Sequence, residues 1–296
     1  MQGYEVVWLP GVDHAGISTQ TVVEKQLWKK SQQTRHDLGR TDFVNRVWDW
    51  KNENGGRIVY QFRRFGVGMD WDRFIFTLDE QRTLAVTEAF VRMNEKGLVY
   101  RANRLVNWCC SLRTALSDLE VEYKDLEKPQ HFTIPGHKSK YEFGYLTHFA
   151  YQFKDGSGEI VVATTRLETM LGDVAVAVHP EDERYKGIVG KELQHPIIKD
   201  REIRVIADPI LVDMAFGTGA VKITPAHDFN DFECGERNGL RKINIFNDDG
   251  TVNHNGGKYE KKMRFDVRVE LYKELDKMGL IRGKTPNPMR IGFCAK

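Results

Sequence analysis

The spacing of apolar residues predicts helices in the first part of the chain. Apolar side chains recur at helical spacing over residues 86–93, and Gly97 is expected to end that helix. The T-x-x-E pattern of residues 77–80 predicts a capping box at its start. A second helix is expected over residues 41–62, where the double glycine at 55–56 is a candidate interruption.

The pattern changes near residue 125, beyond which short β-branched runs and turn clusters predict strands. The runs lie at residues 159–164, 203–206 and 220–224. Helical spacing returns over residues 228–238 and 267–278. This succession of short strands, turns and helices predicts a mixed α+β, barrel-like domain over residues 126–290. The first 125 residues suit part of an α/β domain, although the expected strand–helix alternation is incomplete.

Composition fits a globular protein of one large or two medium domains. Of 296 residues, 41% are hydrophobic and 29% are charged. No apolar run approaches the ~20 residues of a membrane helix, and the first ten residues lack a secretory signal pattern. We therefore expect no membrane association. The net charge of +2 neither demands nor excludes nucleic acid, because a local basic face is sufficient to bind it.

The four cysteines give no metal-binding pattern. They are Cys109, Cys110, Cys234 and Cys294, of which two are adjacent and none form a C-x-x-C pair. Reduced thiols in a reducing, cytoplasmic compartment are the favoured interpretation over disulfides or zinc. Because tetrahedral zinc sites use C-x₂₋₄-C spacing, we predict no metal site.

Two segments place polar residues where strands are expected to end. Residues 10–16 follow an apolar run, so Asp13 is expected at a strand's carboxyl end, where it could hold a ligand's ammonium group or simply cap the next helix. In the second segment, Thr164, Thr165 and Arg166 could grip phosphate and ribose. The alternative there is a T-x-x-E cap formed with Glu168, which does not account for Arg166.

The segment from Phe216 to Asp231 is the richest in candidate chemistry. Its polar residues are Lys222, Thr224, His227, Asp228 and Asp231. Lys222 and Thr224 alternate onto the same face of a strand, whereas Asp228 and Asp231 share one helical face. Acidic residues in a first turn are also favoured by the helix dipole alone. The helix dipole would explain a single aspartate at this position better than it explains two aspartates beside a histidine and a lysine.

These segments, together with residues 105–118, resemble the valyl-tRNA synthetases, a family of class I aminoacyl-tRNA synthetases, over essentially the whole chain. Residues 11–20 look like the segment after the family's first ATP-binding signature. Residues 164–169 and 217–231 look like the two walls of its editing pocket. The resemblance implies a partial Rossmann-type catalytic segment over 1–125 and an editing domain over 126–290. Residues 291–296 would begin the return to the catalytic domain.

The resemblance implies hydrolysis of threonine mischarged onto tRNA(Val). A hydrophobic charging pocket rejects an added hydroxyl only about 100-fold, and the valyl enzymes are themselves the standard case, so a second site must recognise that hydroxyl. Both ATP signatures of the family lack a counterpart here. The resemblance implies that editing needs no cofactor, and that valine, ATP and magnesium belong to the full-length parent. We expect a monomer that binds the acylated 3′ end of tRNA(Val).

Roles for the acidic and cationic residues follow from the resemblance. Asp231 is expected to hold the α-ammonium of the threonyl ester. Asp228 and Thr224 are expected near the threonine hydroxyl, as acceptor and donor. Lys222 and Arg166 would stabilise developing oxyanion charge or hold the terminal adenosine and its phosphate.

The remaining candidates are expected to bind substrate. Phe216 would form an apolar wall or stack on adenine, and Thr164 and Thr165 would bond ribose hydroxyls or the attacking water. His227 is either a general base or, as we favour, a residue making a structural hydrogen bond.

Two rival functions are compatible with parts of the pattern. A metal-dependent phosphohydrolase could use the pair His227 and Asp228, although such sites need further histidines. A non-catalytic tRNA-binding module would bind tRNA without deacylating it.

Overall fold

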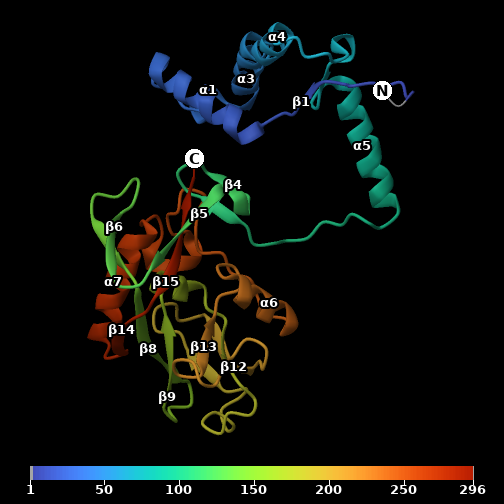
Figure 1. The fold of residues 1–296 in the computed structure, drawn as a ribbon. Coiled ribbons are helices and arrows are strands. Elements are labelled where there is room, and N and C mark those ends of the chain that lie inside the picture. Colours follow the sequence, from blue (N-terminus) through green and yellow to red (C-terminus); the bar gives the residue numbers. More distant parts are fainter. Residues whose placement is uncertain (1–2, 296) are drawn as a thin grey trace. The chain divides into compact units, whose positions relative to one another are not determined.

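The computed structural model describes residues 3–295, and the chain divides into two compact units at the boundary between Asn103 and Arg104 (Figure 1). The first unit is drawn in blue to teal and the second in green to red. Among residues 3–295, no helix combines the length and the apolar character that a membrane span requires.

The first unit is mainly helical. Its helices are α1 (Gly16–Ser31), α2 (Arg35–Leu38), α3 (Arg40–Asn54), α4 (Arg57–Arg64), the 3₁₀ turn η1 (Trp71–Arg73) and α5 (Glu80–Glu95). Two short strands, β1 (Gly11–Val12) and β2 (Ile75–Phe76), pair in parallel, as in an α/β fold. The predicted interruption at residues 55–56 separates α3 from α4, and Gly97 follows α5 with a φ of 69°.

The predicted capping box at residues 77–80 does not form. Asp79 is the N-cap of α5, and its carboxylate accepts from the backbone N–H of Arg82 at 2.9 Å. The Thr77 hydroxyl is instead bonded to the backbone N–H and the ring of His14, at 2.8 and 2.7 Å. A contact 63 residues away therefore overrides the local pattern.

A seven-stranded mixed sheet forms the second unit. Its strands are β8 (Tyr145–Phe153), β9 (Glu159–Thr164), β10 (Ala175–Val178), β11 (Glu192–Gln194), β12 (Glu202–Ala207), β13 (Ala220–Ile223) and β14 (Ile281–Pro286). The order is β13-β10-β12-β11-β8-β14, with β9 also on β8, and only β10 and β12 pair in parallel. Because β13 also packs against β9, the sheet curls towards closure, and the predicted barrel-like α+β fold is confirmed.

Shorter elements surround this sheet. Three further strand pairs form: β3 (Asn107–Cys109) with β4 (Thr114–Leu116), β5 (Val121–Leu126) with β15 (Met289–Cys294), and β6 (Gln130–Thr133) with β7 (Lys140–Phe143). The helices of this unit are η2 (Asp118–Glu120), η3 (Leu167–Gly172), α6 (Phe229–Arg237), η4 (His254–Tyr259) and α7 (Arg264–Lys277). Both helices expected after residue 228 are therefore present.

The second unit begins earlier than the change of pattern near residue 125 suggests. The Trp108 indole N–H donates to the backbone carbonyl of Asp248 at 2.8 Å, and β5 pairs along its whole length with β15. These long-range contacts tie residues 104–125 to the second unit. Residues 291–296 were expected to begin the return to the catalytic domain; of these, residues 291–294 lie in β15 and pair with β5 in the second unit.

The core of the second unit lies between the sheet and α7. Phe149 and Tyr151 of β8, Val176 and Val178 of β10, and Leu271 and Leu275 of α7 are buried in it. Ala175 and Ala177, the alternate residues of β10, are buried in a second, smaller cluster that includes Cys234 of α6. This core fixes the ends of β9, β10 and β13, which carry most of the candidate residues.

Candidate functional site

A buried polar cluster lies where β10 begins and β13 ends. Ala175 lies opposite Ile223 in the antiparallel pair, so Thr224 continues its strand opposite Val174, and the Thr224 side chain contacts the adjacent Asp173. Lys222 donates from Nζ to Asp173 Oδ1 at 3.1 Å and to the Thr224 hydroxyl, which in turn donates to Asp173. The Tyr151 hydroxyl donates to the other Asp173 oxygen at 2.7 Å. Burial raises the pKa of Asp173, whereas Lys222 and the hydroxyl donors favour its ionised form.

Asp231 adds a second carboxylate to this cluster. It lies in the first turn of α6, is only 6% exposed, and accepts from the backbone N–H of Thr224 at 2.8 Å. Burial raises its pKa to about 7, against the opposing influence of nearby Lys222. Ionised Asp231 is thus a buried anion that a further cation would stabilise.

Asp228 is exposed and caps α6. Its Oδ1 accepts from the backbone N–H groups of Asn230 and Asp231, at 2.9 and 3.2 Å. Asp228 is therefore the N-cap of the helix, and both bonds use the same carboxylate oxygen.

Arg166 and His227 hold the strand end of β9 against the loop before α6. Arg166 donates from Nη1 to the backbone carbonyl of His227 at 2.7 Å. The His227 Nε2 accepts from the backbone N–H of Ile245 at 3.0 Å, and its ring packs edge-on against Phe246. Burial, followed by the charges of Arg166 and Lys222, lowers the pKa of His227 to about 3. This neutral ring makes the structural hydrogen bond that the sequence favoured.

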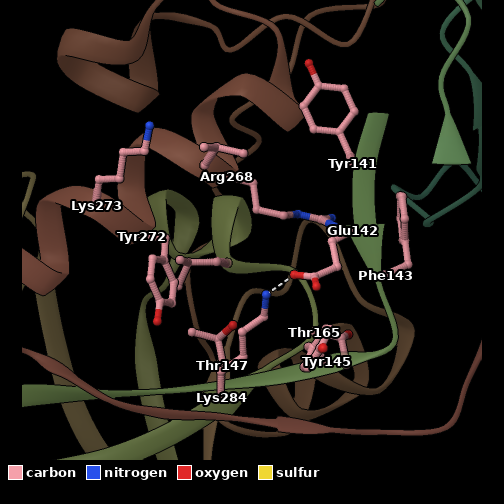
Figure 2. Close-up of a pocket in the computed structure, with 12 residues that line it drawn as sticks. Tyr141, Glu142, Phe143, Tyr145, Thr147, Thr165, Arg268, Tyr272, Lys273 and Lys284 are labelled. Atoms are coloured by element: carbon pink, nitrogen blue, oxygen red, sulfur yellow. Dashed lines mark hydrogen bonds and ion pairs between the residues drawn. The ribbon is translucent and has the colours of Figure 1, made fainter. Parts of the chain in front are cut away.

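The two threonines at the end of β9 have different surroundings. Thr164 is buried, lies opposite Thr147 of β8, and accepts from the backbone N–H of Arg166 at 3.0 Å. Thr165 lines a separate pocket of about 230 Å³ beneath α7 (Figure 2).

The T-x-x-E cap considered for Thr165 and Glu168 does not form, because Glu168 has another partner. Its carboxylate accepts two hydrogen bonds from the guanidinium of Arg268, at 2.6 and 2.7 Å. Glu168 is completely buried, and against the cost of that burial Arg268 holds its pKa at about 2. Sequence spacing cannot reveal this pair, since the partners are 100 residues apart.

Two other candidates lie apart from the buried cluster. Phe216 is 65% exposed, in a loop that turns through Gly217 and Gly219 in left-handed conformations. Asp13 belongs to the first unit, where it lines a pocket of about 540 Å³ together with Trp48. The structure thus brings together Lys222, Thr224 and Asp231, and joins Arg166 to His227.

Asp173 and Tyr151 were missed from the sequence. One signal was present: Asp173 opens the apolar run 174–178, and a charge at the start of a wholly buried strand requires buried partners. Tyr151 offered no such signal, because a tyrosine in an apolar strand is typical of a core.

Comparison with known proteins shows that the chain is similar to tRNA synthetases. The family described as tRNA synthetases class I (I, L, M and V) matches residues 1–274. The chain is 54% identical to the valine--tRNA ligase, mitochondrial 1, of Arabidopsis thaliana over 297 residues, which are 100% of this chain and 27% of the relative. It is 50% identical to the human valine--tRNA ligase over 296 residues, which are 99% of this chain and 23% of the relative. The chain therefore spans about a quarter of the length of these relatives.

A solved structure titled as a ternary complex of LeuRS, tRNA and LeuAMS from Agrobacterium radiobacter K84 is also similar. It is 15% identical, has a TM-score of 0.38, and aligns with 98% of this chain and 40% of that one.

Proposed function

Because this chain belongs to the class I tRNA synthetase family, we propose that its second unit is an editing hydrolase that deacylates threonyl-tRNA(Val). The relatives named above are valine--tRNA ligases, and an enzyme that charges valine needs to remove threonine. Charging itself, with valine, ATP and magnesium, we assign to the full-length parent.

Buried Asp231 is the observation that carries the proposal. A carboxylate that is 6% exposed and accepts a backbone N–H is held ready for a cation. The α-ammonium of an aminoacyl ester is such a cation, and its binding would favour the ionised form of Asp231. The carboxylate would thereby fix the amino acid beside the ester bond.

Recognition of the threonine hydroxyl falls, in our proposal, mainly to Asp228. The Thr224 hydroxyl donates to Asp173, so its hydrogen is already used inside the protein. Asp228 is exposed, and its capping bonds use Oδ1, which leaves Oδ2 as an acceptor for a substrate hydroxyl. Thr224 and Lys222 would then act by positioning the backbone N–H that holds Asp231.

The hydrolysis itself depends more on the positioning of the ester and the attacking water than on a general base. Water attacks the ester carbonyl carbon, the bond to the ribose oxygen breaks, and that oxygen takes a proton as threonine leaves. Arg166 would stabilise the developing oxyanion or hold phosphate, and Phe216 would face the adenine. His227 is a poor general base, since its Nε2 already accepts from Ile245. The same bond removes that nitrogen as the metal ligand that a phosphohydrolase would need.

A side-by-side deacylation assay tests the proposal. Threonyl-tRNA(Val) and valyl-tRNA(Val) are incubated with the 296-residue chain, and loss of the labelled amino acid is followed. We expect threonine to be released at least about 100-fold faster than valine, because a site built for the hydroxyl leaves polar groups unpaired when valine binds. Equal rates would contradict the proposal, and tRNA binding without release would favour the non-catalytic binding module.

A further inference from the structure

Lys222 lies near two buried carboxylates but pairs with only one of them. Its Nζ donates to Asp173 Oδ1 at 3.1 Å, whereas no ion pair joins it to Asp231 in the described part of the chain. All three side chains are buried, and the charge of Lys222 acts on both carboxylates. Because one lysine cannot compensate two buried anions, its choice of partner decides which carboxylate stays open to a further cation.

Asp173 is the carboxylate that holds the lysine. Its Oδ1 also accepts from the Thr224 hydroxyl, and its Oδ2 accepts from the Tyr151 hydroxyl at 2.7 Å. Asp231, by contrast, accepts only the backbone N–H of Thr224, at 2.8 Å, from the residues that the structure describes. Hydrogen bonds to a carboxylate favour its charged form, so Lys222 and the two hydroxyls together hold Asp173 as an anion.

The backbone around Asp173 allows this close approach. Asp173 follows η3, and a Cβ atom on its neighbour Gly172 would lie 3.1 Å from Thr224 Cγ2 and 3.0 Å from the Ile243 carbonyl oxygen. Arg201, a further cation near Asp173, donates to a backbone carbonyl of η3 at 3.1 Å. The chain therefore holds Asp173 against the end of β13 at a distance that a larger residue before it would not permit.

We propose that Asp173 is a positioning residue that binds Lys222 and thereby leaves the Asp231 carboxylate free for the ammonium group of the substrate. Both oxygens of Asp173 are already bonded to protein donors, so it acts through Lys222 and not by touching the substrate. The inference rests on the proposed function, because that function supplies the ammonium group.

A neutral asparagine at position 173 would leave Lys222 without its anion. Asp231 is the other buried carboxylate on which the charge of Lys222 acts, while Asp228, which also influences Asp231, is exposed. Lys222 would then pair with Asp231, and the ammonium group of the substrate would have to displace it. The loss should therefore fall on binding of the ammonium group.

A pair of non-hydrolysable probes tests the inference without any deacylation. The first is 3′-amino-3′-deoxyadenosine acylated with threonine through an amide, and the second is the same compound without the α-amino group. Calorimetric titration of the 296-residue chain gives both affinities, and their ratio isolates the contribution of the ammonium group. We expect the native chain to prefer the amine at least about 10-fold, the lower end for a hydrogen bond to a charged group.

Asp173→Asn should reduce this ratio at least about 5-fold. An unchanged ratio in the folded variant would overturn the inference. A native chain that binds both probes equally, or neither of them, would overturn it as well.

Adding Lys222→Met to Asp173→Asn distinguishes charge compensation from support of the fold. Methionine retains much of the length of lysine without its charge, so the double variant has no unpaired cation to occupy Asp231. We expect the double variant to recover at least about 3-fold of the ratio that Asp173→Asn loses. A ratio no better than that of Asp173→Asn would overturn the inference, because damage to the fold grows with a second substitution.

Tyr151→Phe keeps the packing and removes one donor from the Asp173 carboxylate. The ratio should fall at least about 2-fold, since Asp173 then holds its charge, and with it Lys222, less firmly. Tyr259→Phe is the matched control: the buried Tyr259 hydroxyl donates to Glu274 of α7, and its loss should leave the ratio unchanged. If Asp173→Asn does not fold, an unchanged ratio in Tyr151→Phe overturns the inference.

Deacylation is measured separately from probe binding. A ratio that falls in Asp173→Asn, in a chain that releases no threonine, would support the charge pairing and refute the proposed function. Release of threonine by the native chain, with an unchanged ratio in Asp173→Asn, would support the proposed function and overturn the inference.

Discussion

Both units contain amphipathic helices, but the two units bury their apolar side chains very differently. In the described part of the first unit, only Val23 and Phe43 are classed as buried hydrophobic residues, while Leu84 and Phe90 of α5 are 65% and 55% exposed. In the second unit, Phe149 and Leu271 are completely buried. The local spacing of apolar residues is thus sufficient to form a helix, whereas a core forms only where the apolar face of that helix packs against a sheet.

This difference bears directly on where chemistry can be held. Asp173, Lys222 and Asp231 are all less than 9% exposed, and they lie beside β10, a wholly buried strand. Asp13, in the first unit, is exposed, and it lines a pocket without the buried strands that support the cluster in the second unit. Packing that excludes water holds polar groups in place and shifts their pKa values by desolvation.

Hydrogen exchange gives the largest expected contrast between the units. The amides of α5 should exchange at least about a thousandfold faster than those of β10, because opening free energies range from nearly zero in poorly packed segments to the global value in a core. Exchange of the full chain, followed by mass spectrometry of its peptides, measures both regions together. Equal protection of α5 and β10 would show that the first unit is as well packed as the second.

A matched pair of leucines sharpens the comparison. Leu271→Ala in α7 removes a fully buried side chain and should lower the free energy of unfolding by about 2–5 kcal/mol. Leu84→Ala in α5 removes a side chain that is 65% exposed and should change it by less than about 0.5 kcal/mol. Denaturant unfolding measures both, and a comparable loss from Leu84→Ala would mean that the first unit has a core of its own.

The pH dependence of stability tests the burial of Asp231. Its folded pKa of about 7 lies above the ordinary value of 3.8, so the folded state binds the proton more tightly. Its contribution to stability is fully present below about pH 4 and is lost as the pH rises through 7. Relative to Asp231→Asn, the native chain should therefore lose a few kcal/mol between pH 4 and 7.

Parallel stability curves for the native chain and Asp231→Asn across that pH range would contradict this assignment. Such curves would mean that Asp231 titrates in the folded chain as it does in water.

Much of the fold could be predicted from the sequence because its signals are local. The strand at residues 159–164, the helix break at 55–56 and the helix after Asp228 all follow from periodicity and turn residues. The capping boxes at residues 77–80 and at Thr165 with Glu168 failed because His14 and Arg268, distant in sequence, provide competing partners.

The sequence indicated several residues of the buried cluster, but neither Asp173 and Tyr151 nor the connections between the residues. Spacing placed Lys222 and Thr224 on one face, and they do contact each other. It could not indicate that Asp173, 49 residues from Lys222, accepts from both, so Thr224 was expected to contact substrate directly. Whether two polar side chains form a hydrogen bond with one another depends on strand register, which could not be read from the sequence.

The central claim is that the Asp231 carboxylate holds the ammonium group of the substrate, and one substitution tests it most directly. Asp231→Asn keeps an oxygen for the Thr224 backbone N–H and removes the charge, whereas Glu233→Gln removes an exposed charge from the same helix. With both variants folded by circular dichroism, we predict that Asp231→Asn slows threonyl-tRNA(Val) deacylation at least about 100-fold, or about 2.7 kcal/mol of barrier, while Glu233→Gln keeps the native rate. Deacylation by Asp231→Asn at the native rate would contradict the account and leave Asp231 with a structural role alone.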